Sequence, residues 1–151
     1  TNIEGDKNVY GDAGGITNDI SSLGCPDKWN DHFLNIVSET TCGNQDEGVF
    51  ISEKTFKPII GKRPFMVLGD YNLYKKLHDW GIDTFDDILG DGYKEKLPLD
   101  RIKWIINTVK KLKSHKNLPI LLYKLKPRLD NNLKVLMEVA LDNELKLDSL
   151  I

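Results

Sequence analysis

The feature that most constrains this chain is a pair of short apolar runs separated by a segment long enough for one helix. Residues 33–37 (Phe-Leu-Asn-Ile-Val) and 64–69 (Pro-Phe-Met-Val-Leu-Gly) are rich in β-branched and large apolar side chains, which predicts two buried strands. Between them, Ser52 is a suitable N-cap for a helix, and Pro58 predicts that this helix is kinked or short and ends by Gly61. This order of strand, helix and strand predicts a parallel βαβ unit and therefore an α/β fold.

The pairing of the two strands follows from the same order. We expect Val37 and Leu68 to lie in neighbouring parallel strands, with the N-terminus of the first helix at their carboxyl ends. A second helix from about Tyr71 to Gly81 continues the alternation. Residues 1–31 are rich in Gly, Asn, Asp and Ser, so we expect them to be irregular.

Most of the chain after Asp100 is predicted to be helical. A first helix carries an apolar stripe that needs a partner surface, so we expect it to pack on the sheet. Pro119 and Pro127 are expected to interrupt the segment that follows, and a last helix is expected from about Leu133. The stripe of the first of these helices consists of Ile102, Ile105, Ile106 and Val109.

Charge is distributed unevenly along the 151 residues. The 21 Lys and Arg and the 23 Asp and Glu give a net charge of −2, which argues against a general nucleic-acid binder. Residues 1–100 carry a net charge of −8, residues 101–134 of +9 and residues 135–151 of −3. The basic segment suits an anionic surface or a protein partner, whereas lysines that are simply solvated are the plainer interpretation. No apolar run reaches the ~20 residues of a membrane span.

The cysteines and histidines do not form a recognisable metal or catalytic pattern. Cys25 and Cys42, with His32 between them, lack the paired spacing and the fourth ligand of a zinc site. We therefore predict no metal and two free thiols. His78 falls within a predicted helix and is expected to be a surface residue without a triad partner.

Polar residues gather where the first strand ends and the first helix begins. Glu39 follows the strand, and Glu53 and Lys54 open the helix after Ser52. In open α/β sheets, ligands bind outside the carboxyl ends of the strands, and helix N-termini attract phosphate. On these grounds Lys54 would contact a phosphate and Glu53 a ribose diol. The alternative is that Glu53 compensates the helix dipole and that Lys54 is solvated.

Three motifs of this region read Val37-Ser38-Glu39-Thr40, Phe50-Ile51-Ser52-Glu53-Lys54 and Pro64-Phe65-Met66-Val67-Leu68-Gly69. In order and spacing they resemble the donor-binding lobe of fucosyltransferase-like GT-B glycosyltransferases. They are more similar still to glycosyltransferase-like proteins of viral and bacterial genomes. That second likeness includes Glu53-Lys54-Thr55-Phe56-Lys57-Pro58-Ile59 and Leu77-His78-Asp79-Trp80-Gly81-Ile82-Asp83-Thr84-Phe85. The resemblance covers about residues 33–95.

The resemblance implies a Rossmann-like parallel-sheet lobe, half of a GT-B fold, with a helical C-terminal extension. With the element pattern, it divides the chain into an irregular N-terminal arm or linker (1–32), a nucleotide-sugar-binding core (33–100) and a helical extension packed on that core (101–151). The nucleotide-sugar would be a substrate, and no cofactor is implied.

The resemblance also implies which residues surround the donor. Glu53 and Lys54 inherit the ribose and phosphate roles, Glu39 and Thr40 a place beside the donor, and Ser52 the position that precedes the Glu-Lys pair. Thr40 replaces the family's usual Asn, and Ser52 replaces Thr. Asp91-Gly92-Tyr93-Lys94 keeps only the Asp and Tyr of an Asp-Glu-Ser-Tyr-Asp element found in the viral and bacterial relatives.

Two functional hypotheses follow. A GT-B enzyme transfers sugar between two lobes, and residues 1–32 are too few to form the acceptor lobe. Our first hypothesis is a donor-binding lobe that serves sugar transfer to a glycan or other acceptor, with the catalytic base, to which we assign no residue, on a missing N-terminal lobe or another chain. The second is a viral (phage) structural or accessory protein that keeps the fold without catalysis. We expect a cytoplasmic location, or a virion-associated one under the second hypothesis. Because the chain starts at Thr1 rather than Met, we also expect a fragment or processed product.

Overall fold

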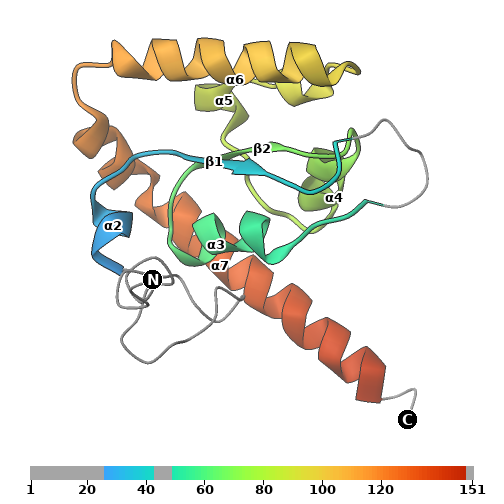
Figure 1. Cartoon of the computed structure of the whole chain (residues 1–151). Coiled ribbons are helices and arrows are strands. Elements are labelled where there is room, and N and C mark those ends of the chain that lie inside the picture. Colours follow the sequence, from blue (N-terminus) through green and yellow to red (C-terminus); the bar gives the residue numbers. More distant parts are fainter. Residues whose placement is uncertain (1–25, 43–48, 149–151) are drawn as a thin grey trace, which may run out of the picture.

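The computed structural model describes residues 26–42 and 49–148, whose helices surround one small sheet (Figure 1). In this view α6 lies on one side of the sheet, and α3 and α7 lie on the other. In chain order the elements are α2 (Pro26–Asn30), β1 (Asn35–Ser38), α3 (Glu53–Ile60), β2 (Phe65–Leu68), α4 (Leu73–Asp79), α5 (Asp86–Leu89), the 3-10 helix η1 (Gly92–Lys94), α6 (Pro98–Lys113) and α7 (Leu118–Asp148).

β1 and β2 pair in parallel, as the sequence predicts. The register aligns Val37 with Val67 and Ser38 with Leu68. Parallel strands need a long crossover connection, and α3 with its flanking loops supplies it. Within the described residues the sheet consists of these two strands. The fold is therefore mixed α/β, mostly helical, with a small two-stranded parallel sheet.

β2 is buried on both faces and along its outer edge. Phe65, Met66 and Val67 are almost completely inaccessible to solvent. The N–H of Val67 points away from β1 and donates to the Tyr74 hydroxyl at 2.7 Å. Because a buried backbone N–H needs a partner, this hydroxyl fills the place that a third strand would take.

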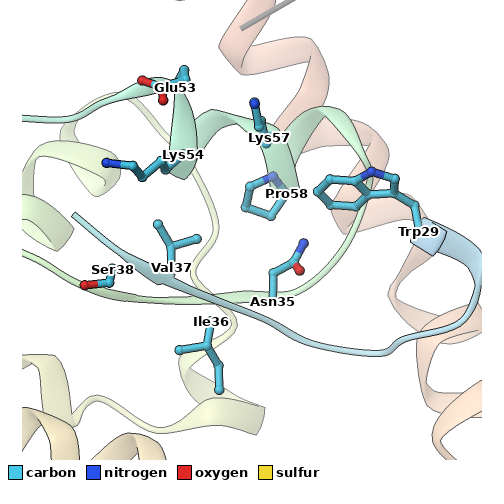
Figure 2. Close-up of a pocket in the computed structure, with 9 residues that line it drawn as sticks. All are labelled: Trp29, Asn35, Ile36, Val37, Ser38, Glu53, Lys54, Lys57 and Pro58. Atoms are coloured by element: carbon cyan, nitrogen blue, oxygen red, sulfur yellow. The ribbon is translucent and has the colours of Figure 1, made fainter. Parts of the chain in front are cut away.

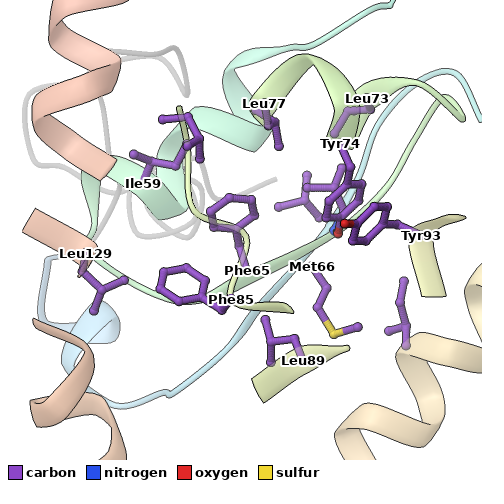
Figure 3. Packing of buried hydrophobic residues seen from close by; sticks show 14 of the residues in the cluster. Ile59, Phe65, Met66, Leu73, Tyr74, Leu77, Phe85, Leu89, Tyr93 and Leu129 are labelled. Carbon is purple, nitrogen blue, oxygen red and sulfur yellow. The ribbon is translucent and has the colours of Figure 1, made fainter. Parts of the chain in front are cut away.

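The hydrophobic core lies around the sheet and draws on the helices from α3 to α7 (Figure 3). Phe65 packs edge to face on Phe85, with ring centroids 6.3 Å apart. Tyr74 stacks on Tyr93 at 4.0 Å. Aromatic pairs of this kind stabilise a fold by about 0.5–1.5 kcal/mol beyond their buried area. Leu129 of α7 belongs to the same cluster, so the last helix shares the core of the sheet.

α3 begins and ends where the sequence predicts. Ser52 is its N-cap, and the Ser52 hydroxyl accepts a hydrogen bond from the N–H of Lys54 at 3.2 Å. The helix ends at Gly61, whose N–H donates to the carbonyl of Lys57 at 2.8 Å. A Cβ atom at Gly61 would lie 2.3 Å from the Trp29 ring. This close approach between α3 and α2 therefore requires glycine.

The prediction that residues 1–32 are irregular is wrong for α2, while residues 1–25 lie outside the described part. Pro26 occupies the first helical position, where its missing N–H costs nothing. The Trp29 ring covers Gly61, and the Trp29 carbonyl accepts a hydrogen bond from Nε of Arg63. These long-range contacts stabilise a helix that local composition alone does not indicate.

α6 buries a different face from the one predicted. The predicted stripe was meant to pack on the sheet, but only Ile105 of its four members is buried, and Ile106 is 47% exposed. The buried face includes polar side chains: Trp104 and Thr108 both donate to the carbonyl of Leu89, at 2.9 and 3.1 Å. Buried carbonyls need donors, so hydrogen bonding rotates the helix away from its most apolar orientation. α6 contacts η1 and β2.

α7 is one helix, so the predicted interruptions at Pro119 and Pro127 are wrong. Pro119 lies in the first turn, where no intrahelical N–H bond is lost. Pro127 lies inside the helix but is flanked by Leu125 and Leu129, which are both buried. Their burial offsets the missing backbone hydrogen bond. α7 packs against α3, and its C-terminal end points away from α6 (Figure 1).

An arginine clamp joins α7 to α5 and the loop before it. The guanidinium of Arg128 binds the carboxylates of Asp83 and Asp87 and lies 5.0 Å from the centroid of the Phe85 ring. Asn132, one turn further, accepts from the N–H of Asp83 at 2.8 Å and donates to its carbonyl at 2.7 Å. The clamp supports Phe85, whose φ of 60° is unusual for a bulky side chain.

Candidate functional site

The candidate site lies at the carboxyl end of the sheet. Glu39 directly follows β1, and Asp70 lies two residues beyond the end of β2. The N-terminus of α3 reaches the same end, because Glu39 is bonded to Ser52. The prediction that the N-terminus of α3 lies at the carboxyl ends of two parallel strands is confirmed.

Glu39 has a buried carboxylate whose two oxygens already accept hydrogen bonds from the protein. It is 6% exposed, and its Oε1 accepts from the N–H of Ser52 at 3.0 Å and from the hydroxyl of Thr55 at 2.5 Å. Its Oε2 accepts from the hydroxyl of Ser52 at 2.6 Å. Hydrogen bonds to an ionised carboxylate are about twice as strong as neutral ones. Glu39 therefore ties β1 to α3 and offers a ligand little free capacity.

The side chain of Ser52 is likewise used for hydrogen bonds within the protein. Its hydroxyl gives its single proton to Glu39 and uses a lone pair for the N–H of Lys54, so both sides of the oxygen are engaged. The carboxylate of Glu39 also lies at the positive end of the α3 dipole, where negative charge is favoured. A negative charge of the chain itself thus already lies beside this helix N-terminus.

Three of the predicted residues remain accessible. Lys54 and Thr40 are both exposed, and Nζ of Lys54 lies 3.3 Å from Oγ1 of Thr40. Glu53 is half-buried in the first turn of α3. The five predicted residues are thus brought together, but they divide into a buried pair and an accessible trio.

A groove of about 360 Å³ runs between β1 and α3 (Figure 2). Glu53 and Lys54 lie at one end, and Pro58 and the Trp29 ring lie at the other. The groove combines ammonium and carboxylate groups with an indole surface. It can accept an anionic group near Lys54 and an apolar or planar group towards Trp29.

Sequence reasoning missed two polar residues at this end of the sheet. Asp70 is buried and accepts from the Thr41 hydroxyl at 2.8 Å and the N–H of Phe50 at 3.3 Å. Arg101 is 2% exposed and donates to the carbonyl of Gly69 at 3.2 Å. Arg101 also donates to the carbonyls of Glu95 and Lys96 at 3.0 and 2.9 Å.

These two residues differ in how far the sequence indicates them. Asp70 follows an apolar strand and Gly69, so its place after a strand end was a usable signal. Arg101 falls within a helical pattern of alternating lysines and apolar residues, and nothing there marks it as buried.

A second polar cluster joins α4 to the segment around α5. The Thr84 hydroxyl donates to Asp86 at 2.6 Å, so the His78 Nε2, 2.7 Å away, is the donor in its contact with Thr84. Tyr93 donates to the other oxygen of Asp86 at 2.6 Å. Burial, together with this hydrogen bond, raises the pKa of Tyr93. His78 is exposed, as expected, and its neighbours are a threonine and a tyrosine rather than an activated nucleophile.

The described residues show neither a metal-binding group nor a membrane-spanning helix. In the part of the chain that the structure describes, no group of three or more His, Cys, Asp or Glu is arranged to hold a metal ion. Cys42 is a free thiol, and Cys25 lies outside the described residues. Across residues 26–42 and 49–148, no helix is long and apolar enough to cross a membrane.

Comparison with known proteins gives no match: no family model, no curated protein and no solved structure matches this chain. The resemblance to fucosyltransferase-like proteins therefore stays a prediction.

Proposed function

We propose that the chain is the nucleotide-sugar donor-binding lobe of a glycosyltransferase-like protein, with a Rossmann-like organisation based on β1, α3 and β2. The observation that carries this function is the position of Lys54. Its exposed ammonium group lies in the first turn of α3, 3.3 Å from the Thr40 hydroxyl that follows β1. Glu53 adds a carboxylate beside it. An ammonium group that donates to a diphosphate and a carboxylate that accepts from a ribose diol together suit a nucleoside diphosphate.

In this function Glu39 and Ser52 are positioning residues. Glu39 accepts two hydrogen bonds from Ser52 and one from Thr55. These three bonds hold the first turn of α3 against the end of β1. Lys54 and Glu53 therefore start from a fixed backbone, which a binding site needs. The catalytic base would come from an N-terminal lobe or another chain, so the isolated chain binds the donor without transferring sugar.

Calorimetric titration with uridine, guanosine and cytidine diphosphates tests this function. Lys54→Ala removes a charge-assisted phosphate contact and should lower affinity at least tenfold, from about 1.5–3 kcal/mol of lost interaction. Glu53→Gln should weaken nucleoside diphosphates more than pyrophosphate, because its partner is the ribose. Lys134→Ala, a similar charge removal on α7, is the matched control and should leave affinity unchanged. No heat with any of the nucleotides, in a chain shown to be folded, would contradict donor binding.

The second candidate is a viral (phage) structural or accessory protein that keeps the fold without catalysis. One observation favours it: Glu39, Asp70 and Arg101 at the carboxyl end of the sheet are all buried and bonded to the protein itself. Polar groups that are already bonded within the protein are typical of a structural role rather than of ligand binding. This candidate predicts no nucleotide binding by the wild type or by any variant, and its partners are other protein chains.

A further inference from the structure

The outer face of α6 is apolar and basic at once. Four aliphatic side chains follow one another at intervals of three, four and three residues, which places them in one line along the helix. We call this line the outer stripe. Its members, with their exposed fractions, are Leu99 (61%), Ile102 (36%), Ile106 (47%) and Val109 (38%).

Lysines accompany the outer stripe, and acids do not. Lys103, Lys110 and Lys113 are exposed and share the same half of the helix as the outer stripe. Of these, Lys103 pairs with Asp100 at 2.8 Å, while no ion pair of Lys110 or Lys113 is found among the described residues. The sequence from residue 101 to 129 contains nine Lys and Arg and no Asp or Glu.

The outer stripe is presented at the edge of the molecule. α6 is the outermost helix on its side of the sheet in Figure 1, and the elements that pack on it lie beneath it. Its 16 residues extend over roughly 24 Å, so the outer stripe and its lysines form a long, convex surface. A flat surface can contact the whole line at once.

We infer that this face of α6 binds the surface of an anionic lipid bilayer, with the outer stripe at the level of the headgroups and the lysines against the lipid phosphates. This goes beyond the proposed donor binding and uses another side of the molecule. Helices that lie in the bilayer interface combine an apolar line with flanking lysines, and each lysine near an anionic membrane strengthens binding. Long lysine side chains also cover apolar surface while their ammonium groups stay in water.

Three other occupants suit the face less well. A coiled-coil partner needs three or four apolar heptads, whereas the outer stripe has two and Lys113 takes the next position. A second copy paired in parallel would bring Lys110 and Lys113 against the same lysines of its partner. Nucleic acid is best held by arginine forks and aromatic stacking, and this face carries neither.

Flotation of the full chain with lipid vesicles tests the inference. We expect binding to vesicles of phosphatidylcholine mixed with phosphatidylglycerol and little binding to phosphatidylcholine alone. Raising the salt from about 0.1 M to about 1 M should release the protein, because the screening length falls from about 10 Å to about 3 Å. Lys110→Gln and Lys113→Gln should each lower the partition coefficient about fivefold. Ile106→Ser should lower it about tenfold.

Matched controls lie in the second half of α7. Leu141→Ser replaces an aliphatic side chain that is 55% exposed, and Lys134→Gln removes a charge; both should leave vesicle binding unchanged. Equal binding to neutral vesicles, or an unchanged partition coefficient for Ile106→Ser, overturns the inference. So does a dimer that Ile106→Ser dissociates in the absence of lipid, or retention by polyuridylate without vesicle binding. Because nucleotide binding is measured separately, either function can fail without the other.

Discussion

Glu39 shows at the scale of one residue how a side chain in a ligand-binding motif can be a structural one. Its carboxylate accepts hydrogen bonds from Ser52 and Thr55 and is almost completely buried, whereas neighbouring Thr40 is exposed. The spacing of the motif brings these residues together without saying which of them face solvent. The sequence could therefore predict that these residues lie together. It could not predict which of them are buried and structural and which are accessible.

Glu39→Gln is expected to destabilise the fold. The amide keeps the shape but replaces an ionised acceptor by a neutral one and places an NH₂ group against hydroxyl and N–H donors, which should cost about 1.5–3 kcal/mol of unfolding free energy. Thr40→Val, next in the chain, should change it by less than about 0.5 kcal/mol. Urea denaturation measures both. Equal stability of the two variants would show that Glu39 does not hold α3 to β1.

At the scale of elements, α6 provides a matched pair of neighbouring isoleucines. Ile105 is 7% exposed and Ile106 is 47% exposed. Ile105→Asp buries a carboxylate with no partner and should unfold the chain or destabilise it by at least about 3 kcal/mol. Ile106→Asp should change the unfolding free energy by less than about 0.5 kcal/mol. Thermal unfolding followed by circular dichroism separates them, and similar midpoints for both variants would contradict the observed orientation of α6.

The arginine clamp that joins α7 to α5 and the loop before it should make stability depend on pH. Burial raises the pKa of Asp83, but hydrogen bonds from Arg128 and the N–H of Phe85 outweigh it and hold the pKa below its usual value. The hydrogen bond from Arg128 also lowers the pKa of Asp87. Carboxyls with a lowered pKa stabilise the fold above their unfolded value of about 4, and this stability is lost as the pH falls through the folded values.

Arg128→Met keeps the apolar stem over the Phe85 ring and removes the charge. Arg128 and Asp83 are about one-third exposed and Asp87 is 62% exposed, so solvent screening limits the expected loss to about 1–2 kcal/mol at neutral pH. The difference from the wild type should begin to shrink below about pH 4, where the carboxyls of the unfolded chain bind protons, and should disappear as the pH falls through the lower pKa values of the folded state. Chemical denaturation across the acid range tests this, and a constant difference would mean that the clamp acts through packing alone.

The helices also show where sequence patterns are sufficient. Ser52 and Gly61 delimit α3 because capping and glycine requirements are local. The orientation of α6 depends on distant carbonyls such as that of Leu89, and Pro127 is tolerated in α7 because of packing on other elements. Neither effect can be seen in a single segment. The strands, their parallel pairing and α3 were predictable. For the segment after residue 100 the helical content was predictable, but the contacts of its helices were not.

At the scale of the whole molecule, we expect one cooperative unfolding transition. α6 contacts β2, α7 contacts α3, and Leu129 shares the core cluster with the sheet. Trp29 and Trp80 precede residue 101 and Trp104 lies on α6, so fluorescence of variants that each retain one tryptophan reports both parts. Coincident midpoints are the expected result. Separate midpoints would show that residues 101–151 fold as an independent unit.

The hydroxyl of Tyr74 that accepts from the N–H of Val67 also bears on how readily this protein would aggregate. Without the oxygen of Tyr74, as in Tyr74→Phe, the N–H of Val67 would lose its partner on the side of β2 that faces away from β1. Such a side is a template on which strands of other molecules can add. After loss of this single oxygen atom, chains would accumulate into insoluble, strand-rich aggregates during refolding. This aggregation would appear before any loss of the native helices was measurable.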